Sequence, residues 1–467
     1  MDTNMKNEAK NDLLFFRKEA SDFMTRAEIT EADDYCKPYI AFLNAAKTER
    51  ETVKAALTMA EQEGFVPWAP GMKLKSGDRV YFNRRGKALI LCTIGKKDFS
   101  SGISIIAAHT DSPRLDFKLQ PLYENSGMAF FDTHYYGSIK PYQWTGIPLA
   151  LHGYIVRADG REIDLIIGEE PDDPRFCIAD LLPHLGEEQM KKPARDAVPA
   201  EKLDILAGLH KFGGKIAGSV KLTVLNLLYE KYGITEKDLV SAEISAVPAF
   251  SASDLGLDRS MVGAYGQDDK ACVYPALTAF LSVKEPEYTA CLVLADKEET
   301  GSQGIGGMQS SFFPGCINAL LEAAGQGENA GGVFSHSFCL SADVNTCLYP
   351  LYPEAFDELG DARLNHGVAL YRYWGRGGKE NTNDADAQTT AALIAILDQA
   401  HILWQTAEGG KVDAGASGTL SRFFANLNIP SIDLGVPLLS MHSPFEVAAK
   451  ADIYMAYRAF TAFFKRT

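Results

Sequence analysis

The sequence predicts an α/β protein in which a mixed sheet is flanked by helices and a second, mainly β domain is inserted. Three observations predict this fold class. Short apolar strands alternate with helical segments toward both ends of the chain, and several of these strands end at polar residues. The middle of the chain is rich in β signals. With 467 residues, the chain is also too long for one ordinary core, so two domains are expected.

The first part of the chain combines helices with three strands. Residues 1–64 are predicted to be helical, and Thr52 to Gly64 has the pattern of an amphipathic helix that the glycine stops. From Lys73 the pattern changes to short strands. The turn residues from Asn83 to Gly86 predict a hairpin between the first two strands. The three strands have the sequences RVYFN, KALILCTIG and ISIIAAH.

The middle of the chain has a different texture. Its β signals include MAFFDTHYYG, IPLALHGYIV and EIDLIIG, and the stretch from Pro171 to Lys202 is polar and contains prolines. VKLTVLNLLYEKYG is compatible with a strand or a helix, and AEISAVPAF is predicted to be a closing strand. We therefore expect an inserted β-rich domain at 114–247. The other domain is then discontinuous, formed by 1–113 and 248–467.

After Val262 the alternation of helix and apolar strand returns. TACLVLAD, SFCLSADV and IPSIDLGVP are predicted to be strands, whereas TTAALIAILDQA is predicted to be a helix. QDDKACVYPALTAFL is expected to be a loop that leads into a helix. The segment from Gly375 to Asp386 has the strongest loop character.

Composition limits the class of partner. The formal net charge of −15 argues against nucleic acid, because phosphate binding needs a basic surface. The eight cysteines form no CxxC pair and several lie in apolar runs, which favours free buried thiols in a reducing compartment. The first residues lack the apolar core of a signal peptide, and no apolar run reaches ~18 residues. The expectation is a cytoplasmic protein with no membrane partner.

Potential metal ligands follow several of these strands. Two adjacent carboxylates, Glu298 and Glu299, come directly after an apolar strand and precede a glycine-rich turn. One of them could bind a metal while its neighbour acts as general base, and the residues alone leave open which does which. Each candidate also has an ordinary explanation, such as a helix N-cap for Asp268 or a turn residue for a histidine. The other candidates are His109, Asp343 and His442.

Considered together, these residues predict a metal centre. All of them lie at strand ends or in loops outside the insertion, and the set contains histidine and carboxylates but no cysteine. Such ligands suit Zn²⁺, and also Mn²⁺ or Co²⁺. Asp111 follows His109 by two residues and could fix the orientation of its ring. Asp268 could bridge two ions ~3.5–4 Å apart, as two-metal hydrolases require.

Five segments in this order resemble the aspartyl aminopeptidase family, whose members are cytosolic two-zinc exopeptidases. They are AAHTDSPRLDFK, GQDDKACVYPAL, ADKEETGSQGIGG, FCLSADVN and LGVPLLSMHSPFE. The similarity spans most of the chain, including the insertion. It implies a mixed sheet of the zinc-exopeptidase type, two Zn²⁺ ions per chain and a substrate with a free N-terminus.

The resemblance also implies roles that the residues alone left open. His109 and Asp343 would bind one zinc ion, and Glu299 and His442 the other. Asp268 would bridge both ions, Asp111 would orient His109, and Glu298 would be the general base. Family members also often have a strained peptide after the bridging aspartate, here between Asp268 and Asp269.

Looser matches concern the substrate. IADLLPHLGEE resembles a segment whose histidine, here His184, reaches the active site of a neighbouring subunit. GRGGKENTNDADAQ resembles the loop of the substrate pocket, with Lys379 where a cation meets an acidic side chain and Arg376 nearby. An ordinary loop histidine and a solvated basic loop are the alternatives. The family commonly has a histidine at the position of Thr346, so the chain departs from the pattern there.

The expected function is therefore removal of an N-terminal residue, Asp or Glu, from peptides. Broad or neutral specificity is an alternative, as is a metal-dependent deacylase or carboxypeptidase with the same ligands. A non-catalytic assembly protein is a further alternative, which the complete ligand set argues against. The resemblance also implies a closed homo-oligomer, a dodecamer of dimers, with 114–247 as the dimerisation domain.

Overall fold

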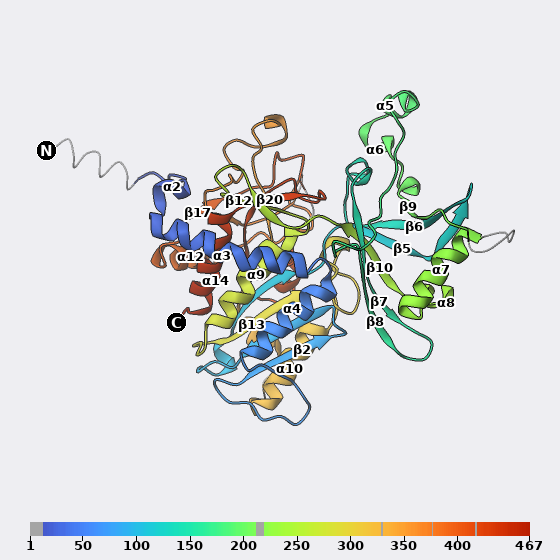
Figure 1. Cartoon of the computed structure of the whole chain (residues 1–467). Coiled ribbons are helices and arrows are strands. Elements are labelled where there is room, and N and C mark those ends of the chain that lie inside the picture. Colours follow the sequence, from blue (N-terminus) through green and yellow to red (C-terminus); the bar gives the residue numbers. More distant parts are fainter. Residues whose placement is uncertain (1–12, 212–218, 328–329, 376, 416–417) are drawn as a thin grey trace.

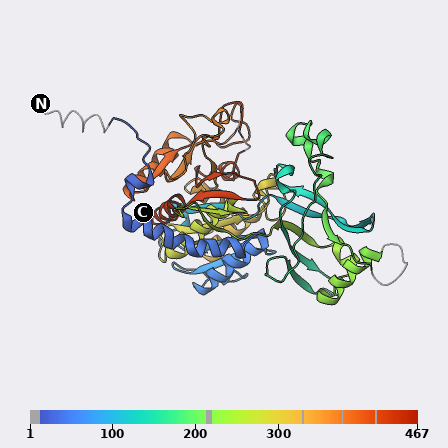
Figure 2. The same ribbon diagram turned by 45° about the horizontal axis from the view of Figure 1, so that its top comes forward.

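The computed structural model describes residues 13–211, 219–327, 330–375, 377–415 and 418–467. Figure 1 shows a larger body in which helices flank a sheet, and beside it a second sheet formed by the middle of the chain. Figure 2 shows the same arrangement after a turn about the horizontal axis, with the second sheet again at one side. The α/β fold class predicted from the sequence is confirmed.

A nine-stranded mixed sheet forms the centre of the larger body. Its strand order is β1-β2-β3-β13-β4-β14-β18-β16-β17. The four central strands, β13, β4, β14 and β18, run parallel to one another, whereas β3 and β16 pair antiparallel to this group. In the order of the sheet the strands are Val66–Pro67, Arg79–Arg84, Ala88–Thr93, Thr289–Ala295, Ile103–His109, Phe338–Ser341, Ser431–Gly435, Val368–Tyr371 and Trp404–Thr406.

Successive residues of the central strands face opposite sides of this sheet, and each side is covered by helices. In β3, Leu89 and Leu91 pack with one group of helices, while Ile90 and Cys92 pack with the other. The first group is α3 (Arg26–Ala45), α4 (Glu49–Gln62), α9 (Gln267–Ser282), α12 (Ala387–Gln399) and α14 (Lys450–Phe464). The second group is α10 (Phe312–Ala323), α11 (Ala330–Phe334) and α13 (Ser421–Ala425).

The helical prediction for residues 1–64 holds in part: residues 1–12 lie outside the described residues, and residues 13–19 are not helical. After the short α2 (Ala20–Phe23), the helices α3 and α4 each begin at a capping box. In α4 the side chain of Thr48 accepts the N–H of Glu51, so this helix starts before the predicted Thr52. Gly64 follows the helix with a φ of +83°, as a helix-stopping glycine requires. The hairpin between β2 and β3 is confirmed.

A six-stranded sheet takes all its strands from 114–248. Its order is β8-β7-β10-β5-β6-β9, and its core is separate from that of the large sheet. The segment that was compatible with a strand or a helix is helix α7. The strands are β5 (Arg114–Asn125), β6 (Met128–Tyr136), β7 (Leu149–Val156), β8 (Glu162–Ile167), β9 (Ile205–Gly208) and β10 (Glu243–Pro248). The helices are α5 (Glu187–Met190), α6 (Ala194–Ala197), α7 (Ser219–Tyr232) and α8 (Glu236–Val240).

A third sheet, which the sequence did not predict, has the order β11-β12-β20-β19-β15. Its strands are too short and too far apart in the chain to give a local pattern: Ser253–Leu255, Met261–Ala264, Glu446–Ala449, Pro437–Leu439 and Asn345–Thr346. All eight cysteines are free, and seven are buried, as predicted. Across the described ranges, none of the helices has the length and apolar character needed to cross a membrane.

Candidate metal centre

The five predicted ligands converge although more than 300 residues separate the first from the last. Three adjacent parallel strands, β13, β4 and β14, deliver side chains at their carboxyl ends, the edge at which α/β sheets place ligands. His109 is the last residue of β4. Glu299 follows β13, and Asp343 follows β14 by two residues. Asp268 lies at the start of α9, and His442 lies between β19 and β20.

The ligands form two groups that share one residue. The first group is His109, Asp268, Asp269 and Asp343, and the second is Asp268, Glu299 and His442. In the first, His109 Nε2 lies 3.1 Å from Asp268 Oδ1 and 3.7 Å from Asp343 Oδ1. In the second, His442 Nε2 lies 3.2 Å from Asp268 Oδ2 and 3.5 Å from Glu299 Oε2. Asp268 therefore turns one oxygen toward each group, which is the geometry of a bridging carboxylate.

Buried oxygens without hydrogen-bond partners indicate that this centre suits cations. Asp268 Oδ1, Asp269 Oδ1 and Glu299 Oε1 are buried and have no hydrogen-bond partner within the described ranges. Leaving a buried carboxylate oxygen unpaired costs free energy that a bound metal ion would remove. The donor set of imidazole nitrogens and carboxylate oxygens is one that Zn²⁺ accepts. The residues present therefore fit the metal that the sequence predicted.

Both imidazoles present Nε2 to the centre because Nδ1 has another partner. His109 Nδ1 lies 3.0 Å from the backbone carbonyl of Asp111 and 3.5 Å from its carboxylate Oδ1. His442 Nδ1 lies 2.8 Å from the backbone carbonyl of Ser138. Such contacts select the tautomer that leaves Nε2 as an acceptor for metal. Ser138 belongs to the middle segment of the chain, so that segment also contributes to the centre.

Asp111 has a second task that the sequence did not suggest. Its Oδ1 accepts the backbone N–H of Glu298 and its Oδ2 accepts that of Glu299, each at 3.2 Å. The Tyr136 hydroxyl donates to Oδ2 at 2.7 Å. Asp111 is fully buried. The Asp111 carboxylate therefore holds the turn that carries both glutamates. Asp111 also contacts His109.

Glu446 is a further residue of the centre that sequence reasoning missed. Its two oxygens accept the backbone N–H groups of Asp268 and His442, at 3.1 and 2.8 Å. It therefore ties the shared ligand to a ligand of the second group. Its place at the end of the motif LGVPLLSMHSPFE was the available signal. The backbone of Asp343 requires a glycine at position 435, because a Cβ there would lie 1.6 Å from the Asp343 carbonyl oxygen.

The electrostatics of the centre reflect its excess of carboxylates. Burial favours the neutral form of His109, but contacts with Asp111, Asp268 and Asp343 outweigh burial and raise its pKa well above the ordinary value. Burial and the neighbouring carboxylates of Asp343, Asp111 and Asp268 raise the pKa of Glu298 to about 8. A general base works best when its pKa lies near the working pH, because it must both accept and return a proton.

Two of the three predicted substrate residues, His184 and Lys379, lie outside the two ligand groups. His184 is exposed, on a turn before α5, and Leu182 and Leu185 beside it are also exposed. Lys379 lies on the loop between β16 and α12, where its Nζ is 2.8 Å from Asp384 Oδ2 and 3.9 Å from the centroid of the Tyr373 ring. Its charge is therefore already paired within the loop. Arg376 lies outside the described residues.

Comparisons with known proteins agree with this centre. Residues 42–464 match the family model described as aminopeptidase I zinc metalloprotease (M18). A probable M18 family aminopeptidase 1 from Clostridium acetobutylicum is 42% identical over 97% of this chain and 99% of its own length. The corresponding protein from Thermotoga maritima is 41% identical over 93% of this chain and 96% of its own.

Solved structures show the same fold. The crystal structure of an M18 family aminopeptidase from Thermotoga maritima has a TM-score of 0.93 and 40% identity, covering 97% of this chain and all of that one. A structure of the S. cerevisiae mApe1 dodecamer has a TM-score of 0.76 with 18% identity, covering 94% of this chain and 97% of that one. At that identity the likeness concerns the fold alone.

The fold, the ligand groups and these matches define a metallo-exopeptidase. The chain belongs to the M18 family and is a zinc aminopeptidase.

Proposed function

We propose that this zinc aminopeptidase removes an acidic N-terminal residue, Asp or Glu, from peptides, using two Zn²⁺ ions per chain. The observation that supports two ions is the bridging position of Asp268, with one oxygen toward each ligand group. His109 and Asp343 would complete one site, and Glu299 and His442 the other. Mn²⁺ or Co²⁺ could occupy the same oxygen and nitrogen ligands.

When bound, the ions would acidify a water molecule and stabilise the negative charge that develops on the scissile carbonyl oxygen. The protein's own residues perform the remaining steps. A carboxylate oxygen of Glu298 accepts the proton from the attacking water and later gives a proton to the leaving amine. Asp111 holds the backbone of Glu298 in place during both transfers. Since Glu446 holds the backbone N–H groups of two ligands, it keeps the ligand groups in register.

The acidic preference rests on the family resemblance and on Lys379. An acidic side chain would have to compete with Asp384 for the Lys379 ammonium group, because these two already lie 2.8 Å apart. That pairing favours the second candidate, the same reaction with broad or neutral specificity. The net charge of −15 also works against long-range attraction of acidic peptides, so a local pocket would have to supply the preference.

We also propose that residues 114–247 form a dimerisation domain and that the dimers assemble into a dodecamer. Supporting this, the segment around His184 carries exposed Leu182, Leu185 and Met190, an apolar group that a partner could cover. The S. cerevisiae mApe1, which shares the fold, has been solved as a dodecamer. In the assembly, His184 would reach the active site of a neighbouring subunit. The free cysteines suit a reducing cytoplasmic location.

A panel of unblocked dipeptides that differ only in the first residue tests the specificity. Initial rates with Asp, Glu, Leu, Lys and Ala, with N-acetylated controls and a chelator arm, should show chelator-sensitive preference for Asp and Glu. A preference for Leu or Ala would support the second candidate. Activity on blocked substrates alone would contradict aminopeptidase chemistry at this centre.

Glu298→Gln tests the assignment of the base. The variant should lose turnover by about a thousandfold, on the order of 4 kcal/mol of transition-state stabilisation, while keeping its bound zinc. Glu287→Gln, at an exposed ion pair remote from the ligand groups, is the matched control and should keep full activity. Retained turnover in Glu298→Gln would remove this residue from the role of base.

A further inference from the structure

A tyrosine of the six-stranded sheet reaches into the metal centre. Tyr136 is the last residue of β6, and it is 7% exposed. Its hydroxyl donates to Asp111 Oδ2 at 2.7 Å, the same oxygen that accepts the N–H of Glu299. A charge-assisted hydrogen bond of this length is among the stronger polar contacts in a protein. It joins the inserted sheet to the turn that carries the proposed base.

The Tyr136 ring is held by two cations. The Arg114 guanidinium lies 4.1 Å from the ring centroid, and the Lys297 ammonium lies 5.2 Å from it. Lys297 precedes Glu298 directly, so the ring contacts the catalytic turn through a side chain as well as through Asp111. These contacts leave the ring little freedom to turn its hydroxyl away from Asp111.

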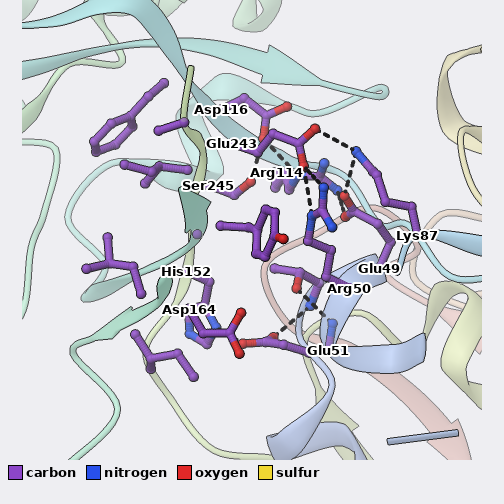
Figure 3. A pocket seen from close by; sticks show the side chains of 18 of the residues that line it. Glu49, Arg50, Glu51, Lys87, Arg114, Asp116, His152, Asp164, Glu243 and Ser245 are labelled. Atoms are coloured by element: carbon purple, nitrogen blue, oxygen red, sulfur yellow. Dashed lines mark hydrogen bonds and ion pairs between the residues drawn. The ribbon is translucent and has the colours of Figure 1, made fainter. Parts of the chain in front are cut away.

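Arg114 is itself fixed at the junction of the two parts of the chain. It is 4% exposed, and its guanidinium lies 3.0 Å from Glu49 Oε2 and 2.8 Å from Asp116 Oδ1. Figure 3 shows Arg114 in the pocket at this junction, together with Glu49, Lys87 and Asp116. Glu49 belongs to α4, whereas Asp116 belongs to β5. The support of Tyr136 therefore comes from both parts of the molecule.

We propose that Tyr136 is a positioning residue for the aminopeptidase reaction, acting through Asp111 on the backbone of Glu298 and Glu299. The inserted sheet then has a task in catalysis within a single chain, apart from any assembly. The proposal rests on the proposed roles of Glu298 as base and Glu299 as ligand. The hydroxyl is the group through which Tyr136 acts on Asp111, because it donates the hydrogen bond to Oδ2.

Tyr136→Phe tests this because it keeps the ring beside its two cations and removes only the hydroxyl. We expect kcat to fall about tenfold to a hundredfold with KM changed less than about twofold, as for other residues that support a metal ligand. Zinc should leave the variant more readily in competition with a chelator, by a similar factor. Amide hydrogen exchange across residues 297–301 should rise in the apo and zinc-loaded protein.

Tyr123→Phe is the matched control. It also removes a tyrosine–carboxylate hydrogen bond in the same sheet, since the Tyr123 hydroxyl lies 2.5 Å from Asp204 Oδ2, but it does not touch the centre. This control should keep wild-type kcat, zinc retention and exchange at 297–301. Equal losses in both variants would overturn the proposal, because a general loosening of the sheet would then explain them. Wild-type values in Tyr136→Phe would also overturn it.

A double-mutant cycle of Tyr136→Phe and Asp111→Asn is a second test of the proposal. It includes Asp111→Asn alone, which can be measured even if Tyr136→Phe folds poorly. Asp111→Asn replaces one acceptor oxygen by an NH₂ group, so it loses the hydrogen bond from the backbone N–H of Glu298 or from that of Glu299. If Tyr136 acts through Asp111, the zinc-release effects of the two variants must be non-additive. Additive effects would overturn the proposal, and so would unchanged exchange at 297–301 in Asp111→Asn. Turnover by Glu298→Gln would instead contradict the proposed function and leave these exchange readouts interpretable.

Discussion

Within the residues that the structure describes, a second cluster of histidine and carboxylate lies apart from the metal centre and lacks its features. The second, the His152 cluster, is formed by His152 of β7, Glu51 of α4 and Glu169. His152 Nδ1 lies 2.6 Å from Glu51 Oε1, and Nε2 lies 2.9 Å from Glu169 Oε1. Figure 3 shows His152 and Glu51 at the junction pocket. Like His109, His152 is buried and has carboxylates beside both nitrogens.

The two clusters differ in whether their carboxylate oxygens already have hydrogen-bond or cation partners. In the His152 cluster, Lys47 Nζ lies 2.6 Å from Glu169 Oε1, and Glu51 Oε2 accepts the N–H groups of Lys47 and Thr48. The two carboxylates of this cluster therefore already have a cation and N–H donors as partners. In the metal centre, oxygens of Asp268 and Glu299 are buried without a hydrogen-bond partner in the described ranges. Unsatisfied buried oxygens, and not the mere proximity of histidine and carboxylate, distinguish a cation site from a structural ion-pair cluster.

The largest expected effect comes from removing the shared ligand. Asp268→Ala should lower kcat/KM by at least about a thousandfold, since both ligand groups lose an oxygen and several kcal/mol of charge stabilisation depend on the ions. Bound zinc measured by mass spectrometry of metals should fall as well. Glu169→Gln, in the His152 cluster, should keep both activity and zinc. Equal zinc loss in the two variants would break the comparison.

Removal of zinc by a chelator should lower the stability of the protein through the metal centre and not through the His152 cluster. Zinc binds the folded chain, so its removal should lower the free energy of unfolding by about 4 kcal/mol where free zinc had been about a thousandfold above Kd. The shift in Tm on adding chelator should be the same in wild type and in His152→Gln. It should be absent in Asp268→Ala. A chelator effect that disappears in His152→Gln would place metal at the His152 cluster.

His152→Gln should destabilise the fold without impairing the chemistry. Losing the imidazolium leaves two partly buried carboxylates facing a neutral side chain, which we expect to cost about 1–3 kcal/mol. Chemical denaturation measures the loss, and kcat should stay within about twofold of wild type. His134→Gln, at an exposed histidine of β6, is the control and should change neither. A large fall in kcat for His152→Gln alone would show that the His152 cluster also serves the metal centre.

The pH dependence of stability gives the smallest and sharpest test. Burial lowers the pKa of His152, but Glu169 and Glu51 outweigh it and raise the pKa to about 9. Because the folded pKa exceeds the ordinary value near 6.5, the stabilisation is fully present below about pH 6.5 and is lost as pH rises through about 9. Denaturation of chelated wild type between about pH 6 and about pH 9.5 should show this decline. The decline should be reduced in His152→Gln, and an equal decline in both would contradict it.

The sequence predicts the strands of the central sheet better than it predicts the start of helix α4. The runs TACLVLAD, ISIIAAH and SFCLSADV are strongly apolar, and β13, β4 and β14 form from those runs. Because each strand ends at polar residues, His109, Glu298 and Asp343 could be named as candidates from residue type and order alone. The start of α4 was placed too late because the capping box of Thr48 and Glu51 lies outside the apolar periodicity that defined the helix.

Residue types and their positions at strand ends could therefore be read from the chain alone. Which of them face one another depends on the fold: Asp268 has an oxygen for each group, Asp111 carries the backbone of both glutamates, and Tyr136 reaches them from the other sheet. Periodicity and turn chemistry act over a few residues, whereas these contacts and that of His442 join segments 25 to 304 residues apart. No local pattern encodes such a pairing, and only the packing of the sheets brings it about.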